Sequence, residues 1–353
     1  MEATTPGRIC LFGEHQDYLG LPVIPMAVSL YSRVKGVRSK EKKVVIQKPD
    51  LNETESFSLD DLTYSKPRDY YKSGIKVCRE EGLTFSHGFD VKLSSGIPIQ
   101  AGCGSSSSIM VGWIHFLSQV ADNKINWPQE KIAELAYKAE VLEFGEPGGM
   151  MDQYSTAMGG IIYLESEPEI SLMLLNPLPG TFVLGDSREK KNTMDILQHC
   201  KNNRLEIINK LKINDPGFSL HSIKITEITN FANVLNKNEM TLLWGTIKNR
   251  DILREALDEL QSENPNYELV GSLLTDHHAV LRDTLKVSTP KVEKMLDAAL
   301  AAGAWGGKIN GSGGGGCMFA YAPENPEAVA EGIEKVGGKT YNVKSVDGSR
   351  ILS

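Results

Sequence analysis

The chain has 353 residues, of which 41% are hydrophobic and 24% charged, an ordinary globular composition that excludes disordered, collagenous and coiled-coil proteins. Its 45 acidic and 38 basic residues give a formal net charge of -7, which argues against a general nucleic-acid or anionic-membrane surface. A chain of this length is expected to form two domains or one large mixed domain.

The first hundred residues are predicted to be mostly β-structure. Short segments rich in Val, Ile and aromatic residues, bounded by turn residues, predict strands at 8–13, 30–36, 43–47 and 89–93. The spacing of apolar residues then predicts helices over 67–81, from Ser105 onward, and over 128–144. A Ser-rich start can cap the second of these helices, and Pro128 suits the first turn of the third.

The second half begins with strands and becomes helical. Strands are predicted near 161–164, 171–175 and 181–185, a helical pattern from about 193 to 302, and then a strand at 317–321, a helix at 326–336 and a strand at 339–343. Because strands come in runs instead of alternating strictly with helices, the pattern predicts an α+β protein with antiparallel sheets. The change of pattern near residue 180 predicts two domains, 1–180 and 181–353.

Cysteine usage and the absence of apolar runs bear on the compartment. Five scattered cysteines, with no C-x-x-C pair, predict neither a disulfide framework nor a thiolate zinc site. The start of the chain has no basic segment followed by an apolar one, and nowhere do eighteen apolar residues run together. We therefore expect a cytoplasmic protein with reduced thiols and no membrane span.

The most informative segment is Gln100-Ala-Gly-Cys-Gly-Ser-Ser-Ser-Ser108, which follows a strand and begins a helix. Gly102 and Gly104 allow a tight turn and close approach of a ligand, while the first N–H groups of a helix have no intrahelical partner. This pattern predicts a phosphate cradle, and its hydroxyls could ligate magnesium. A Ser-rich cap on a core helix is the alternative interpretation.

Three further segments carry polar or glycine-rich patterns. Arg8, Glu14, His15 and Asp17 lie close together around a short strand end, where they could face a cleft or form a solvated turn. Asp152 is a single acid among Gly and Met, and it could be a catalytic base, a ligand or a helix cap. Residues 306–316 contain seven glycines in eleven positions, a conformational cost that indicates close backbone approach or a flexible loop.

Taken in order, these segments resemble the GHMP small-molecule kinases, and among them the galactokinase branch. Residues 6–20, with Gly-Glu-His-x-Asp-Tyr, are similar to the sugar-binding signature of that branch. Gly102–Ser107 resembles the phosphate loop of the family, Gly149–Gln153 the segment with the catalytic aspartate, and Lys308–Cys317 the third, glycine-rich motif. A further similarity to galactokinases is His278-Ala-Val-Leu-Arg-Asp283.

The resemblance implies a fold, a chemistry and a set of site residues. It implies two α+β domains, the N-terminal one related to ribosomal protein S5 domain 2, with the active site in the cleft between them. It implies an ATP-dependent sugar kinase, a monomer or homodimer with ATP and Mg²⁺ as cofactors, a monosaccharide as its small-molecule partner, and neither nucleic acid nor membrane as a partner. The residues carried over are Asp152 and Arg8 for catalysis, Gly102, Cys103, Gly104, Ser105, Ser106 and Ser107 for ATP, Glu14, His15, Asp17 and Gly149 for substrate, and Ser106 and Glu140 for the metal.

Departures from galactokinases leave the substrate open. The second-domain Tyr-Asn-x-Arg segment is absent, because residues 199–204 read His-Cys-Lys-Asn-Asn-Arg, and Leu19 replaces a usual polar residue. The sugar is therefore not fixed, although the C1 hydroxyl is the expected acceptor. A non-sugar GHMP kinase such as a mevalonate kinase and a catalytically silent sugar sensor are the alternatives, and the Asp17-Tyr18 pair favours a sugar over mevalonate.

Overall fold

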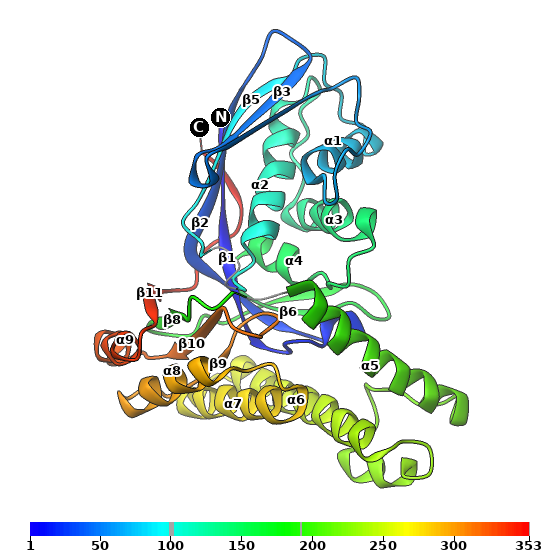
Figure 1. Ribbon diagram of the computed structural model, residues 1–353, viewed down its shortest axis with the longest axis vertical. Helices are drawn as coiled ribbons and strands as arrows, with labels where there is room; N and C mark the ends of the chain where they lie inside the picture. The colour runs from blue at the N-terminus through cyan, green and yellow to red at the C-terminus, as the bar shows by residue number, and fades with distance from the viewer. Residues whose placement is uncertain (99–101, 191–192, 353) are drawn as a thin grey trace.

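The structure, a computed structural model, describes residues 1–98, 102–190 and 193–352, and within these ranges it forms two β-sheets with helices packed against them (Figure 1). The larger sheet of the described residues has eight strands and the smaller has four. The larger contains β1 (Glu2–Phe12), β2 (Ile24–Arg38), β3 (Lys43–Lys48), β4 (Glu53–Ser58), β5 (Phe89–Ser95), β6 (Ile161–Glu165), β7 (Ser171–Leu175) and β12 (Arg350–Leu352). The smaller contains β8 (Phe182–Asp186), β9 (Gly306–Ile309), β10 (Cys317–Tyr321) and β11 (Lys339–Val343).

The helices form one group for each sheet (Figure 1). The helices of the first half are α1 (Tyr70–Glu80), α2 (Ser105–Val120), α3 (Gln129–Glu140) and α4 (Met151–Met158), and α2 packs directly on β1 and β2. The helices of the second half are α5 (Thr193–Asn214), α6 (Lys237–Gln261), α7 (Tyr267–Val280), α8 (Pro290–Ala301) and α9 (Pro326–Lys335). No helix in the described ranges is both long and apolar enough to cross a membrane.

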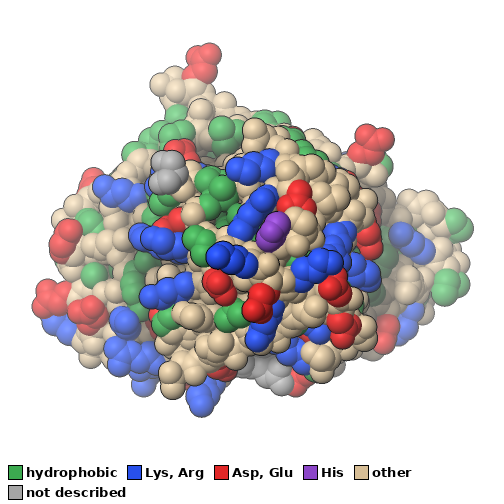
Figure 2. All heavy atoms as spheres, turned by 90° about the horizontal axis from the view of Figure 1, so that it is seen from above, with side chains coloured by type: hydrophobic (Ala, Val, Ile, Leu, Met, Phe, Trp, Pro, Cys, Tyr) green, Lys and Arg blue, Asp and Glu red, His purple; other side chains and the backbone are tan. Residues whose placement is uncertain are grey.

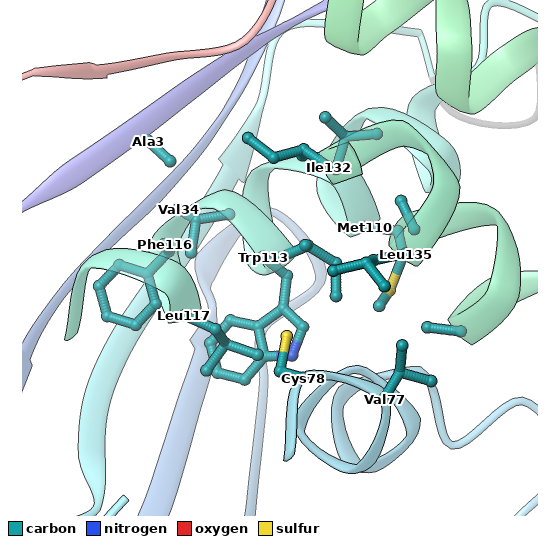
Figure 3. Packing of buried hydrophobic residues seen from close by; sticks show 14 of the residues in the cluster. Ala3, Val34, Val77, Cys78, Met110, Trp113, Phe116, Leu117, Ile132 and Leu135 are labelled. Carbon is teal, nitrogen blue, oxygen red and sulfur yellow. The ribbon is translucent and has the colours of Figure 1, made fainter. Parts of the chain in front are cut away.

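The core of the first half fixes the position of α2, the helix that follows the predicted phosphate loop. Trp113, Phe116 and Leu117 on α2 are fully buried between the sheet and the neighbouring helices α1 and α3 (Figure 3). The indole Nε1 of Trp113 donates to the backbone oxygen of Tyr71 at 3.1 Å, so the polar edge of the largest core side chain is satisfied. This packing holds the start of α2 against β1.

The surface at the far end of the larger sheet is strongly charged. Seen from above, Lys and Arg side chains are numerous across this face, and Asp and Glu side chains lie between them (Figure 2). Within the larger sheet, Glu2 on β1 is paired with Arg33 and Lys35 on β2 at 3.5 and 3.4 Å. Such exposed pairs contribute little to stability, because water and salt screen them.

The structure confirms the α+β class and most of the predicted elements, with some differences. β1 and β2 are longer than predicted, and β4, α4, β9 and β12 were not predicted. The sheets are mostly antiparallel, but β3 and β5 pair in parallel, so the prediction of purely antiparallel sheets was wrong. The forty residues between these two strands contain β4 and α1, which is enough chain for the crossover that a parallel pair requires.

The path of the chain between the sheets bears on the domain division. The larger sheet contains β7, which ends at Leu175, and the smaller sheet contains β8, which begins at Phe182. The last strand, β12, then returns to the larger sheet and pairs antiparallel with β1. The division into 1–180 and 181–353 stays a prediction, and the returning strand adds the C-terminal residues to the first sheet.

Candidate active site

A cavity of about 490 Å³ lies where the larger sheet, α2 and α4 face the glycine-rich segment between β9 and β10. All of the residues predicted to act in catalysis or to bind ATP, substrate or metal line this cavity: Arg8, Glu14, His15, Asp17, Gly102, Cys103, Gly104, Ser105, Ser106, Ser107, Glu140, Gly149 and Asp152. Two residues quoted with the phosphate loop, Gln100 and Ala101, lie outside the described residues. The structure thus brings the predicted residues together, while their individual roles stay predictions.

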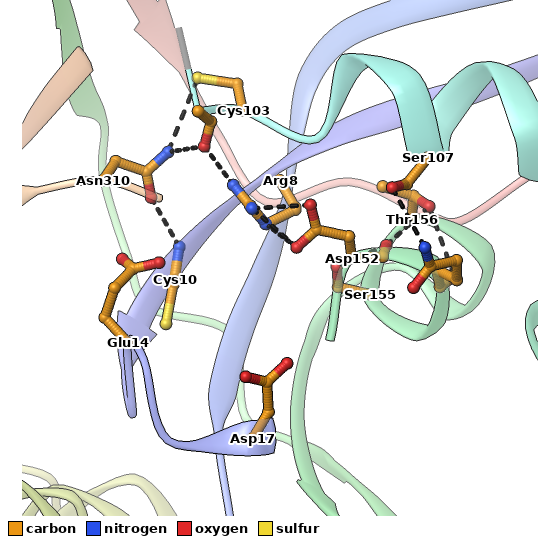
Figure 4. A network of polar contacts seen from close by, with 12 residues as sticks. Arg8, Cys10, Glu14, Asp17, Cys103, Ser107, Asp152, Ser155, Thr156 and Asn310 are labelled. Atoms are coloured by element: carbon orange, nitrogen blue, oxygen red, sulfur yellow. Dashed lines mark hydrogen bonds and ion pairs between the residues drawn. The ribbon is translucent and has the colours of Figure 1, made fainter. Parts of the chain in front are cut away.

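An Arg–Asp pair lies at the centre of the cavity wall (Figure 4). Arg8 projects from β1 and Asp152 from the first turn of α4, and the guanidinium donates through Nε to Oδ1 at 2.7 Å and through Nη2 to Oδ2 at 2.8 Å. This bidentate geometry is the strong, oriented form of the ion pair. Burial alone would lower the pKa of Arg8, but Asp152 and Glu14 raise it above its ordinary value, so the cation is permanent.

The phosphate loop lies against the Arg8–Asp152 pair at two glycines, Gly102 and Gly104, which have no side chains. Gly102 and Gly104 have φ of 83° and 68°, which L side chains rarely adopt. A Cβ on Gly104 would lie 3.2 Å from Cγ of Arg8 and 3.6 Å from Oδ2 of Asp152.

Helix α2 begins at Ser105, so its first N–H groups face the cavity beside the Arg–Asp pair, in the arrangement that binds phosphate. The N-cap is Gly104, with no side-chain cap bond, and the Ser-rich cap interpretation was wrong.

Ser106 and Glu140 form an oxygen-rich corner next to the loop. The Ser106 hydroxyl donates to Oε1 of Glu140 at 2.7 Å, and Nε2 of Gln153 donates to Oε2 at 2.7 Å. Glu140 is only 5% exposed; burial raises its pKa, and the hydrogen bonds from Ser106 and Gln153 oppose that shift. A buried carboxylate without a cationic partner, beside a hydroxyl, suits a hard divalent cation.

This corner differs from an all-protein metal cage. Among the described residues, no group of three or more His, Cys, Asp or Glu side chains could hold a metal ion. Mg²⁺ is usually held by one or two carboxylates together with substrate phosphates and water. The pair of Ser106 and Glu140 fits that mode, because it supplies two oxygen ligands and opens on the phosphate loop.

Glu14 is committed to an ion pair within the protein. Lys308, which is fully buried on β9, donates to Oε2 of Glu14 at 2.8 Å and to the backbone oxygen of Cys10 at 2.8 Å. Glu14 itself is 2% exposed. Its first task is therefore to neutralise Lys308, since a buried unpaired ammonium would be very costly.

His15 also has protein partners for both ring nitrogens. Nε2 lies 3.1 Å from the backbone oxygen of Ser312, and Nδ1 lies 2.8 Å from the hydroxyl of Tyr18. A carbonyl oxygen only accepts, so Nε2 donates to Ser312. The Tyr18 hydroxyl is hydrogen-bonded to Nδ1 of His15 and accepts a short hydrogen bond from Arg204. His15 thus joins the turn at residues 13–20 to α5 and to the glycine-rich segment, and its role in substrate binding stays a prediction.

Asp17 is a carboxylate of the cavity wall to which no cationic side chain among the described residues is bonded. It accepts hydrogen bonds from the backbone N–H groups of Tyr18, at 2.9 Å, and of Met151. Burial and the nearby Asp152 raise the pKa of Asp17 to about 6. Its carboxylate packs so closely on Gly149 that a Cβ there would overlap it, which explains why position 149 requires glycine.

Several residues of the site were given no role of their own by the sequence analysis. Lys308 and Asn310, in the glycine-rich segment, contact the first turn and the phosphate loop from about three hundred and two hundred residues away. One end of the cavity is apolar and aromatic, and its side chains come from β3, β5, α1, α2 and the loops beside them: Lys48, Leu51, Tyr71, Leu93, Pro98 and Ile109. These residues are ordinary strand and helix residues in the sequence, and only the fold groups them.

Comparison with known proteins places this site in a family. Residues 69–160 match the GHMP kinases N terminal domain, 240–341 match the GHMP kinases C terminal domain, and 2–34 match the galactokinase galactose-binding signature. The mevalonate kinase of Thermococcus gammatolerans is 31% identical over 95% of this chain and 93% of its own length. The chain belongs to the GHMP kinase family. The family resemblance seen in the sequence is thereby confirmed, and GHMP kinases are ATP-dependent phosphotransferases.

The relatives of this GHMP kinase include both galactokinases and mevalonate kinases. The galactokinase of Pyrococcus furiosus is 28% identical over 91% of this chain and 88% of its own length. Among solved structures, Lactococcus lactis galactokinase complexed with galactose has a TM-score of 0.86 at 22% identity, covering 99% of this chain and 95% of that one. The Methanococcus jannaschii mevalonate kinase has a TM-score of 0.74 at 23% identity, covering 98% of each chain. These structures confirm the two-domain GHMP fold.

Proposed function

We propose that this GHMP kinase transfers the γ-phosphoryl group of ATP to a monosaccharide, at the C1 hydroxyl. The observation that carries the choice of a sugar is Asp17, an anionic acceptor at the cavity wall that accepts hydrogen bonds from the backbone N–H groups of Tyr18 and Met151. A carboxylate can accept from two neighbouring hydroxyls, as a pyranose presents them. Mevalonate brings a carboxylate of its own, which Asp17 and Asp152 would repel.

The pairing of the charged side chains in the cavity supports the choice of a sugar over mevalonate. Among the described residues that line the cavity, Arg8 is paired with Asp152, Lys48 with Glu55 and Arg68 with Glu146. Each of these cations therefore already has an anionic partner. Recognition of a substrate carboxylate normally uses an Arg or Lys that is free to pair with it. A neutral polyol needs acceptors and donors instead, and Asp17 supplies the acceptor.

The reaction uses the Arg–Asp pair and the phosphate loop. Asp152 faces the cavity with 27% of its side chain exposed, and it accepts the proton of the acceptor hydroxyl as that oxygen attacks the γ-phosphorus. Arg8 orients the carboxylate and offsets the negative charge of the transferring group, while the first N–H groups of α2 hold the phosphates. When Mg²⁺ is bound at Ser106 and Glu140, it neutralises charge on the phosphate oxygens.

The apolar and aromatic side chains at one end of the cavity would bind the nucleotide base. The side chains there are mostly apolar or aromatic, with Tyr71 from α1 and Ile109 from α2 on neighbouring walls. A flat, weakly polar purine fits such surroundings, because burial of its faces against apolar groups is favourable. The phosphates then extend toward Gly102 and Gly104.

A coupled ADP-release assay tests the proposal across a panel of free monosaccharides, their N-acetylated and uronic derivatives, and mevalonate. We expect a monosaccharide to give the highest kcat/KM. Mevalonate phosphorylation is the second candidate, favoured by the 31% identity to a mevalonate kinase, and the assignment to sugars is wrong if mevalonate is preferred over every sugar. Absence of turnover with every acceptor, together with tight sugar binding, would instead indicate a sensor.

A further inference from the structure

Asn310 directly follows β9 in the smaller sheet and reaches across to the larger one (Figure 4). Its Oδ1 accepts from the backbone N–H of Cys10 at 2.9 Å, and its Nδ2 donates to the backbone oxygen of Gly102 at 2.7 Å. Its own backbone N–H donates to the oxygen of Cys317 at 2.9 Å. One buried side chain therefore connects a strand of the smaller sheet to both β1 and the phosphate loop.

The chemistry of the two partners requires an amide at this position. The N–H of Cys10 only donates and the carbonyl of Gly102 only accepts, so the orientation of the Asn310 amide is fixed. A carboxylate could serve Cys10 but has no proton for Gly102, and an apolar side chain serves neither. Asn310 is fully buried, so a partner left without it would lack compensation from water.

The carbonyl of Gly102 links Asn310 to the catalytic pair. It accepts a second, short hydrogen bond from Nη1 of Arg8. The Nε and Nη2 atoms of the same guanidinium donate to Asp152. The orientation of this one carbonyl thus helps to set where the guanidinium lies. Arg8 also donates its backbone N–H to the oxygen of Cys103 at 3.0 Å. This hydrogen bond joins the backbone of β1 to the backbone of the phosphate loop.

The glycine that follows Asn310 allows this approach. Gly311 has φ of 75°, and a Cβ there would lie 2.8 Å from Cα of Gly102. The backbones of the glycine-rich segment and of the phosphate loop are therefore in direct contact. This contact places the Asn310 amide within hydrogen-bond distance of Gly102.

We propose that Asn310 is a positioning residue: it holds the Gly102 carbonyl in the orientation that places Arg8 against Asp152, and it fixes the phosphate loop to the smaller sheet. Asn310 does not line the cavity, so it acts on turnover and nucleotide binding through Arg8 and Gly102. The proposal rests on the phosphoryl transfer of the proposed function. It is independent of whether the acceptor is a sugar.

The test compares Asn310→Asp and Asn310→Ala with a matched control, Asn249→Ala. Asn249 is another buried asparagine, 3% exposed on α6 and outside the cavity lining. We expect both Asn310 variants to lower kcat about tenfold to a hundredfold, the range of one lost buried hydrogen bond. KM for the acceptor should stay within twofold, because no substrate contact changes. The control should leave kcat within twofold.

Binding of ADP, measured by calorimetry, gives a readout that needs no acceptor. We expect Kd for ADP to rise at least fivefold in Asn310→Ala, because the phosphate loop loses the donor that fixes Gly102, and to stay unchanged in Asn249→Ala. Unchanged ADP affinity together with unchanged kcat, or a kcat loss equal to that of the control, would overturn the positioning role. A wild-type preference for mevalonate would overturn the sugar assignment alone.

Discussion

Replacing Asp152 with Asn removes the base from the cavity while keeping the shape of the side chain. In the protein, the two carboxylate oxygens meet two guanidinium nitrogens of Arg8 at 2.7 and 2.8 Å. The amide of Asn can satisfy one of these donors with its oxygen, but it turns an NH₂ group toward the other. The variant thus loses both the proton acceptor and half of the interaction that orients Arg8.

The expected loss follows from these two effects. General-base assistance is commonly worth about 10²–10⁴ in rate, or roughly 2.7–5.4 kcal/mol at about 1.36 kcal/mol per factor of ten. A lost charge-assisted hydrogen bond costs roughly 1.5–3 kcal/mol, part of which is felt in the same transition state. We therefore expect kcat of Asp152→Asn to fall at least a hundredfold.

The assay measures ADP release at saturating ATP and acceptor, with ADP affinity determined in parallel. ADP should bind Asp152→Asn within about threefold of the wild type, because the phosphate loop is intact. Asp258→Asn, an exposed carboxylate on α6, makes the same change in net charge and should leave kcat unaltered. A kcat above one tenth of the wild-type value in a pure Asp152→Asn preparation would refute the role of Asp152 as base.

Three further predictions concern the metal corner, the acceptor site and the thiols. Ser106→Ala removes one oxygen ligand, so the Mg²⁺ concentration for half-maximal activity should rise severalfold; an unchanged Mg²⁺ dependence would assign the ligation to another hydroxyl. Asp17 has a pKa of about 6 in the folded protein and must be ionised to accept two hydrogen bonds, so KM for the acceptor should rise below pH 6 with KM for ATP steady, and Asp17→Ala should raise KM about tenfold to a hundredfold at pH 7 and abolish that pH dependence. All five cysteines are buried and we expect them to be reduced, so a reductant should leave the melting temperature unchanged, and an intact mass two units low would contradict this.

Local sequence patterns predicted the parts of the site that depend on neighbours in the chain. The phosphate loop is a strand, two glycines and a helix start in one segment, and Asp152, the proposed base, lies in the first turn of α4 directly after a short Gly-rich stretch. These parts were predictable because the tight turn before a helix depends only on neighbouring residues, here on the positive φ of Gly102 and Gly104. Resemblance to a family added the order of these segments along the chain.

The pairs that join distant segments could not be predicted in the same way. Lys308 meets Glu14 across 294 residues, and Asn310 meets Gly102 across 208, and no spacing rule links positions so far apart. His15 shows the consequence. The family resemblance predicts that His15 binds the substrate, and this role stays a prediction, but its contacts with Ser312 and Tyr18 could not be predicted from the sequence. The strand β12 has only three residues, too few for a periodic signal, and its pairing with β1 depends on the whole fold.

Phosphorus NMR of the isolated product tests the central claim most directly. The protein is incubated with ATP, Mg²⁺ and equal concentrations of its best monosaccharide and of mevalonate, and the ³¹P signal of the new phosphate ester is recorded with proton coupling. Phosphorylation at a sugar C1 predicts a doublet, because that carbon carries one proton. A triplet, from phosphate on a CH₂ group as in a primary alcohol such as that of mevalonate, would contradict transfer to the C1 hydroxyl.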